Sequence, residues 1–239
     1  MRIGVDVGGT NTDAVVMDGR TVVAWHKAPT TENVSDGIVG AIGAVLGQAK
    51  IAAGDVHAVM IGTTHFTNAF VQRQRLLPVG IIRIALPSSR GVPPLSDWPA
   101  DMADAVGRHH HMIVGGYQYD GREADPLDER AVAEAARSLR AAGISTVAIT
   151  GLFSPVNAAM EERAADIVRQ ELPDASITLS SRIGRMGILE RENAAVMNAS
   201  LAELSREVVG SFRAALARLR IDASFFISQN DGTHMSADC

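Results

Sequence analysis

A glycine corner near the amino terminus holds the residue types best suited to chemistry. It lies between two aliphatic segments and reads Asp6-Val7-Gly8-Gly9-Thr10-Asn11-Thr12-Asp13. Gly8 and Gly9 can adopt positive φ and expose backbone N–H groups, which in such a corner form an anion-binding concavity. Asp6 stands among aliphatic residues, where an ionised carboxylate is costly unless a partner compensates it. The corner adds two hydroxyls and a second carboxylate, from Thr10, Thr12 and Asp13. A carboxylate there suits a Mg²⁺ ion carried by phosphates, so the corner predicts a site for nucleotide phosphate and magnesium in a β-hairpin.

Other glycine-rich structures have different requirements. A Walker loop needs G-x-x-x-x-G-K-[ST], and the only two lysines, Lys27 and Lys50, lie outside any glycine loop. A dinucleotide fingerprint needs a helix after the glycines, whereas an apolar strand pattern follows here. A plain tight hairpin without a ligand is also Gly-rich and remains the alternative.

Two further polar corners follow predicted strands. Gly62, Thr63 and Thr64 lie where a strand turns into a helix, a place where backbone N–H groups and the helix dipole favour an anion. An ordinary N-cap by either threonine is the alternative. The last predicted strand, Phe225–Ser228, ends in a polar glycine turn, Gln229-Asn230-Asp231-Gly232-Thr233.

Two other polar groups have simpler explanations. Neighbouring side chains in a strand point to opposite faces, so His109, His110 and His111 are poorly arranged to bind one metal ion. Glu190 and Arg191 precede a long predicted helix, and their default interpretation is an exposed ion pair of little consequence for stability.

Composition limits the classes of partner. The chain has 239 residues, a net charge of −5 and a pI of about 5.8, so nucleic acid is a poor candidate. Its apolar runs are too short to cross a membrane, and Met1 leads directly into a strand rather than a signal peptide. The single cysteine, Cys239, has no partner for an internal disulfide. These features are typical of a cytoplasmic protein.

Hydrophobic periodicity predicts an α/β fold. Strands are expected at 2–7, 13–17, 21–26, 56–61, 78–86, 146–152, 176–180 and 225–228. Helices are expected around 38–46, 127–142 and 157–172, with one long helix over roughly 192–219. The alternation of strand and helix in the middle of the chain predicts a parallel layer.

The corner at 6–13 resembles the first phosphate motif of the actin, sugar-kinase and heat-shock ATPase superfamily. More narrowly, it resembles the D-x-G-G-T-x-T-D opening of the hydantoinase A and 5-oxoprolinase family, which includes N-methylhydantoinases. Further segments similar to this family lie at 62–69, 153–162, 180–183, 189–191 and 229–232. The chain departs from the family at Ile61, where a histidine is usual, and at 86–90, where T-x-G-F-R-D is usual.

This resemblance implies an actin-like, ribonuclease H-like ATPase lobe that opens with a β-hairpin and continues into a further αβ layer. It implies a first family region over 1–182 and the start of a second over 183–239. Family members continue for several hundred residues and contain a second glycine corner, which is absent here. The chain is accordingly expected to be the amino-terminal part of a longer enzyme.

In that family, ATP phosphorylates the carbonyl oxygen of a cyclic amide such as hydantoin or 5-oxoproline, and water then opens the ring. By resemblance, Asp6 would organise Mg²⁺ or water, and Thr63 and Thr64 would face the transferring group or the substrate. The residues expected to bind or support ATP phosphates are Gly8, Gly9, Thr10, Thr12, Asp13, Gly62, Asn230 and Gly232.

The resemblance also implies a second polypeptide of the hydantoinase B type, and it is compatible with a homo-oligomer. Two other functions remain open at this point. One is a component of an ATP-dependent acetone-type carboxylase, and the other is an ATP-binding regulatory protein without turnover. The 239 residues alone are expected to be inactive.

Overall fold

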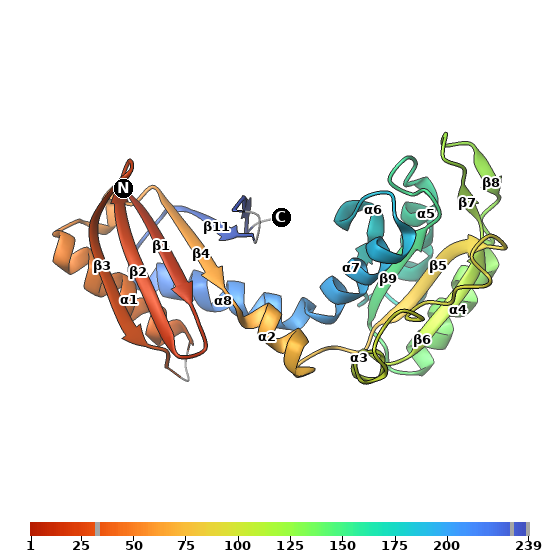
Figure 1. Cartoon of the computed structure of the whole chain (residues 1–239), viewed down its shortest axis with the longest axis horizontal. Helices are drawn as coiled ribbons and strands as arrows, with labels where there is room; N and C mark the ends of the chain where they lie inside the picture. Colours follow the sequence, from red (N-terminus) through yellow and green to blue (C-terminus); the bar gives the residue numbers. More distant parts are fainter. Residues whose placement is uncertain (32–33, 230–231, 238–239) are drawn as a thin grey trace. The chain divides into compact units, whose positions relative to one another are not determined.

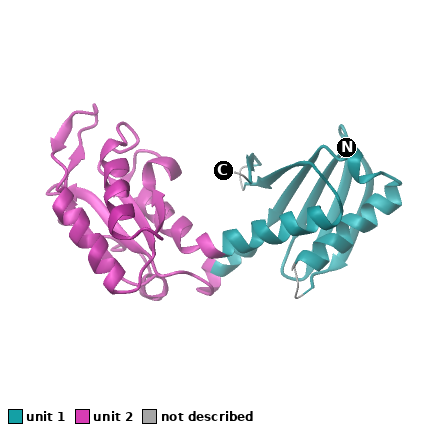
Figure 2. Ribbon diagram, turned by 180° about the vertical axis from the view of Figure 1, so that it is seen from behind, with its two compact units in different colours: residues 1–69, 204–239 teal, residues 70–203 magenta. Residues whose placement is uncertain are grey.

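The computed structural model describes residues 1–31, 34–229 and 232–237, and the chain forms two compact units. The first unit contains residues 1–69 and 204–239, and the second contains residues 70–203 (Figure 2). The predicted boundary between residues 182 and 183 concerns family regions and stays a prediction. The compact units follow a different division because the last helix and strands return to the amino-terminal sheet.

The first unit is built on a six-stranded mixed sheet in the order β12-β11-β4-β1-β2-β3 (Figure 1). Its strands are β1 (Arg2–Val7), β2 (Asn11–Asp18), β3 (Thr21–Pro29), β4 (Ala58–Thr63), β11 (Ser224–Ser228) and β12 (His234–Ser236). β1 pairs antiparallel with β2 and parallel with β4, and β11 is parallel to β4. The predicted opening hairpin is therefore confirmed. Three parallel strands end at the edge where the hairpin turns.

Two helices, α1 (Val34–Ala49) and α8 (Ala202–Arg218), cover one face of this sheet (Figure 2). Ile3, Val5 and Val7 are buried beneath them, and α8 adds Phe212 to the same core. Because side chains alternate along a strand, Asp6 projects to the opposite face and is exposed. The expectation that Asp6 is buried among aliphatic residues was wrong, since its aliphatic neighbours in the sequence lie on the other face. The short helices η1 (Ala53–Asp55) and α2 (His65–Gln72) flank β4 in the sequence.

The second unit contains a four-stranded parallel sheet in the order β10-β9-β5-β6. Its strands are β5 (Gly80–Leu86), β6 (His109–Val114), β9 (Thr146–Gly151) and β10 (Ser176–Leu179). One apolar core lies between the sheet and the helices α4 (Glu129–Ala141) and α5 (Ala159–Glu171). A second core includes residues of α3 (Ala100–Ala105) and α7 (Ile188–Ser200). The remaining elements are β7 (Gly116–Tyr117), β8 (Glu123–Asp125) and α6 (Ser180–Ile183). The predicted parallel layer is confirmed.

The long helix predicted over 192–219 is instead two helices, α7 and α8, separated at Leu201. The sequence here contains neither proline nor a glycine at the break. The Ser200 hydroxyl donates to the Met197 carbonyl, and the Ser200 carbonyl accepts from the Leu77 N–H at 2.8 Å. Leu201 N–H then bonds to Asn198 O, one residue short of the α-helical partner. A contact from a distant segment therefore ends the helix.

In the part of the chain that the structure describes, none of the helices combines the length and the apolar character that crossing a bilayer requires.

Candidate functional site

The tip of the β1–β2 hairpin is held by a short network of hydrogen bonds. Gly8 N–H donates to Asn11 O at 2.9 Å and so closes the turn. Thr30 forms hydrogen bonds to both sides of the tip. Its N–H donates to Thr10 O and its hydroxyl donates to Gly8 O, each at 2.9 Å. The Gly8 N–H is consequently occupied within the turn and is not free to bind a ligand.

Gly9 has no structural requirement to be glycine. Neither Gly8 nor Gly9 adopts a positive φ, although the sequence allowed it. A Cβ placed on Gly8 would meet Asn11 O at 3.2 Å, whereas a Cβ placed on Gly9 would have no atom within 4 Å. Gly9 is also exposed. The close approach of a ligand to the backbone is one physical reason for a glycine at such a position.

Two carboxylates lie side by side on the open face of the sheet, since Asp6 and Asp13 are paired in register. Lys27 compensates Asp13 with an ion pair of 3.2 Å. The Asp6 carboxylate has no hydrogen bond or ion pair with another described residue. Its Oδ1 lies 3.3 Å from the position of a Cβ on Gly62, so any larger residue there would crowd this carboxylate.

The carboxylate of Asp6 suits a magnesium ion that is also bound by the phosphates of a ligand, rather than an ion held by protein side chains alone. Within residues 1–31, 34–229 and 232–237, no cluster of three or more His, Cys, Asp or Glu side chains could hold a metal. Mg²⁺ in nucleotide sites usually takes one or two carboxylates and completes its shell with phosphate and water. Asp6, which is exposed and lacks a compensating cation, meets that requirement.

The end of β4 lies directly beside the hairpin tip, because Thr63 pairs with Val7 and Gly62 pairs with Asp6. The Thr63 hydroxyl lies 3.2 Å from Val7 O and 2.5 Å from His65 Nδ1. Thr64 is exposed and accepts a hydrogen bond from Asn68 Nδ2 at 3.4 Å. The strand-to-helix corner predicted at 62–64 is therefore confirmed, and it shares an edge with the glycine hairpin.

A third segment reaches the same edge from β11 and β12. Ser228 Oγ lies 3.1 Å from His234 Nδ1, and Gly232 adopts a φ of +83° in the turn between the two strands. Asn230 lies outside the described residues. A cavity of about 580 Å³ opens on the uncovered face of the sheet, and its lining includes Asp6, Asp13, Trp25, Met60, Ser228 and His234.

The structure separates the predicted site residues into two groups. Asp6, Gly9, Thr10, Asp13, Gly62, Thr63, Thr64 and Gly232 belong to strand ends or turns at this edge. Thr12 is 1% exposed, and its hydroxyl lies 3.2 Å from that of Thr30, so it supports the hairpin from the covered side. Sequence reasoning missed Lys27 and Thr30, whose contacts depend on the β2–β3 register.

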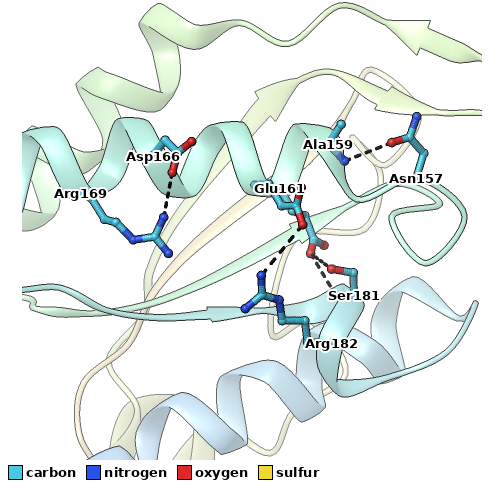
Figure 3. Close-up of polar contacts among 8 residues, drawn as sticks. Asn157, Ala159, Glu161, Asp166, Arg169, Ser181 and Arg182 are labelled. Atoms are coloured by element: carbon cyan, nitrogen blue, oxygen red, sulfur yellow. Dashed lines mark hydrogen bonds and ion pairs between the residues drawn. The ribbon is translucent and has the colours of Figure 1, made fainter. Parts of the chain in front are cut away.

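A buried polar network lies in the second unit, where further segments resemble the family. Glu161 on α5 accepts hydrogen bonds from Ser181 N–H and Ser181 Oγ, at 3.0 and 2.7 Å (Figure 3). Arg191 is 1% exposed and donates to Ser180 Oγ at 2.8 Å. Burial lowers the pKa of the Arg191 guanidinium, and the carboxylates of Glu161 and Glu192 oppose that shift. The expectation of an exposed Glu190–Arg191 ion pair was wrong, because Arg191 points into the fold.

The opening hairpin and mixed sheet of the first unit and the parallel sheet of the second unit define an α/β fold. The chain belongs to the family described as the hydantoinase/oxoprolinase N-terminal region, whose model matches residues 2–172.

Relatives extend this similarity over nearly the whole chain. The chain is 33% identical to the alpha subunit of the caprolactamase of Pseudomonas jessenii over 74% of its length and 27% of that protein. It is 26% identical to the gamma subunit of the acetophenone carboxylase of Aromatoleum aromaticum, over 96% of this chain and 35% of that protein.

Two solved structures share the fold. An ATP-dependent caprolactamase from Pseudomonas jessenii superposes with a TM-score of 0.79 at 26% identity, covering 99% of this chain and 36% of the other. A nucleotide-free acetone carboxylase superposes with a TM-score of 0.80 at 22% identity, covering 100% of this chain and 37% of the other. The chain thus spans roughly a third of the length of these proteins.

Proposed function

We propose that this chain is the phosphate-binding first lobe of an ATP-dependent enzyme that opens cyclic amides. Gly9 carries the proposal, since it is an exposed glycine that neither a positive φ nor a steric contact requires. It lies at the edge shared by three strand ends, one residue from the turn that fixes Gly8. A phosphate lying against this backbone explains the glycine, because any side chain would stand between the ligand and the N–H groups.

In this proposal, the backbone binds phosphate, and side chains bind the metal ion and the transferring group. The exposed backbone at Gly9 and Thr10 holds phosphate, Asp6 orients Mg²⁺ or its water, and Lys27 offsets the neighbouring Asp13 charge. Thr63 and Thr64 present hydroxyls to the transferring group or the substrate carbonyl. ATP would supply the phosphoryl group, and Mg²⁺ would neutralise its charge; such reactions depend mainly on positioning and charge stabilisation.

The proposal includes three features of the whole enzyme. The first is a hydrolase activity on a ring amide such as hydantoin, 5-oxoproline or a lactam. The second is a partner polypeptide of the hydantoinase B type. The third is a cytoplasmic location, where ATP is present.

A second candidate is a component of an ATP-dependent ketone carboxylase. The observation that favours it is the similarity to the acetophenone carboxylase gamma subunit over 96% of the chain. Both reactions need ATP to activate an oxygen, and the described edge serves either one. ADP release by the longer polypeptide with its partner distinguishes them. Release that depends on a ring amide supports the hydrolase, whereas release that needs a ketone and bicarbonate supports the carboxylase.

Nucleotide binding tests the proposed site directly. The ¹⁵N-labelled chain is titrated with ATP and Mg²⁺ by NMR, which detects millimolar affinities. We expect shifts centred on residues 8–11 and 62–65. Gly9→Ala should abolish them and leave the rest of the spectrum unchanged. Gly54→Ala is the matched control, because Gly54 also lacks a positive φ and has open space around its Cβ position. Equal binding by both variants would remove the phosphate assignment.

A further inference from the structure

The peptide unit between Gly8 and Gly9 has a defined orientation at the hairpin tip. Its two polar groups, Gly8 O and Gly9 N–H, point to opposite sides because the unit is planar and trans. Gly8 O accepts a hydrogen bond from the Thr30 hydroxyl at 2.9 Å. Gly9 is exposed, and no hydrogen bond joins its N–H to another described residue. The Gly9 N–H therefore points away from Thr30 and is available to a ligand.

Two consecutive glycines make this peptide unit easy to invert. Inversion changes ψ of Gly8 and φ of Gly9, and glycine tolerates both changes because it has no Cβ. The inverted unit would present the Gly8 carbonyl oxygen, which repels a phosphate, in place of the N–H that binds it. A site that uses Gly9 for the close approach of a ligand accordingly needs another residue to hold this peptide unit in place.

Thr30, which directly follows β3, makes the contacts that hold it. Its N–H donates to Thr10 O, so its main chain is attached to the other side of the tip. A hydroxyl has one hydrogen, and that of Thr30 is used on Gly8 O, since a carbonyl can only accept. Thr12 Oγ1 lies 3.2 Å from Thr30 Oγ1, so the Thr12 hydroxyl is the donor in that pair. Because Thr12 is 1% exposed, the two hydroxyls form a chain from the covered side of the sheet to Gly8 O.

We propose that Thr30 is a positioning residue of the phosphate site, and that its hydroxyl holds the Gly8–Gly9 peptide unit with the N–H directed towards the ligand. Thr30 acts through Gly8 O and does not itself touch the phosphate. The inference rests on the proposed function, and it gives the buried Thr12 hydroxyl the task of orienting Thr30. The competing explanation is that Thr30 only stabilises the fold of the hairpin.

Two substitutions of Thr30 separate these explanations. Thr30→Val keeps the shape of the side chain and the N–H bond to Thr10 but removes the hydroxyl, whereas Thr30→Ser keeps the hydroxyl. We expect the Val variant to bind ATP–Mg²⁺ roughly threefold to tenfold more weakly than wild type, because loss of one hydrogen bond lowers the fraction of chains with the binding-competent peptide orientation. The Ser variant should bind like wild type. Thr21→Val, at an exposed threonine that begins β3, is the matched control.

NMR of the free chain reports the peptide orientation without any ligand. In Thr30→Val, the carbonyl ¹³C resonance of Gly8 should shift, and relaxation dispersion should detect microsecond-to-millisecond exchange at the Gly9 amide. Neither change is expected in Thr30→Ser or Thr21→Val.

Three results would overturn the positioning role of Thr30 and leave Gly9-dependent binding intact. They are wild-type affinity in Thr30→Val, an equal loss of affinity in Thr30→Ser, and unchanged Gly8 and Gly9 signals in Thr30→Val. A wild-type chain that binds neither ATP–Mg²⁺ nor inorganic triphosphate would overturn both this inference and the proposed function.

Discussion

Glu161 shows how a fully buried charge is accommodated in the second unit. It is 0% exposed, and its two oxygens accept four hydrogen bonds, from Gly151 N, Ser180 Oγ, Ser181 N and Ser181 Oγ. Arg191 reaches the same Ser180 hydroxyl and donates to Gly151 O at 2.5 Å. The network joins the ends of β9 and β10 to α5 and α7, so its charges are compensated where water is absent.

Replacing Glu161 with Gln should destabilise the chain by about 3 kcal/mol. The amide is nearly isosteric, but its NH₂ group faces groups that donate hydrogen bonds to Glu161. It also removes the larger of the two carboxylate contributions that act on Arg191, those of Glu161 and Glu192. Glu162→Gln is the matched control, since Glu162 is exposed and its contact with Arg182 is 3.9 Å. Urea unfolding of both variants measures the difference. A Glu161 variant as stable as the control would show that the network is not important for stability.

At the scale of elements, the edge strand β6 carries a pH-dependent group. Burial lowers the pKa of His111 below its ordinary value of 6.5, and the charges of His110 and His109 lower it further. The folded state therefore binds this proton more weakly than the unfolded state does. Stability contributed by neutral His111 is complete above the ordinary value and is lost as the pH falls towards the lower folded value.

His111→Gln should reduce the loss of stability between roughly pH 7 and pH 5, because the substituted side chain does not titrate in that range. Urea midpoints of wild type and variant across this range give the measurement. His57→Gln, which removes an exposed histidine of the first unit, serves as control. Parallel pH curves for wild type and His111→Gln would rule out His111 as the source.

At the scale of the whole chain, the uncovered face of the six-stranded sheet is notable for its apolar character. Trp25 is 68% exposed and lines the cavity on this face together with Val15 and Met60. The relatives and solved structures are roughly three times as long as this chain, which covers 35 to 37% of most of them. The proposed site therefore presents one wall, formed by a single glycine corner, to its ligand.

We predict that the 239-residue chain alone has no measurable ATP-dependent ring opening. One wall leaves water in the site, and the reacting groups are not held within the few tenths of an ångström that catalysis requires. The assay combines the purified chain with ATP, Mg²⁺ and hydantoin or 5-oxoproline, and follows phosphate release. Substrate-stimulated release at an ordinary enzymatic rate, roughly 1 to 1000 per second, would show that this single lobe is sufficient.

Short sequence patterns were sufficient to predict the secondary structure around the proposed site. The alternation of Ile3, Val5 and Val7 around a Gly-Gly turn predicts the hairpin, because period-two burial and turn chemistry are properties of short segments. The corner at Gly62 and the parallel layer of the second unit were predicted for the same reason.

The tertiary structure decided features that depend on which face is covered and which distant groups meet. Asp6 is exposed because both helices lie on the other face of the sheet. Arg191 is buried because Gly151 O accepts its hydrogen bond and the carboxylate of Glu161 compensates its charge. The break at Leu201 depends on Leu77, which is far away in the sequence. Val7 and Thr63 are also far apart in the sequence. Their pairing brings the glycine hairpin and the end of β4 to one edge of the sheet.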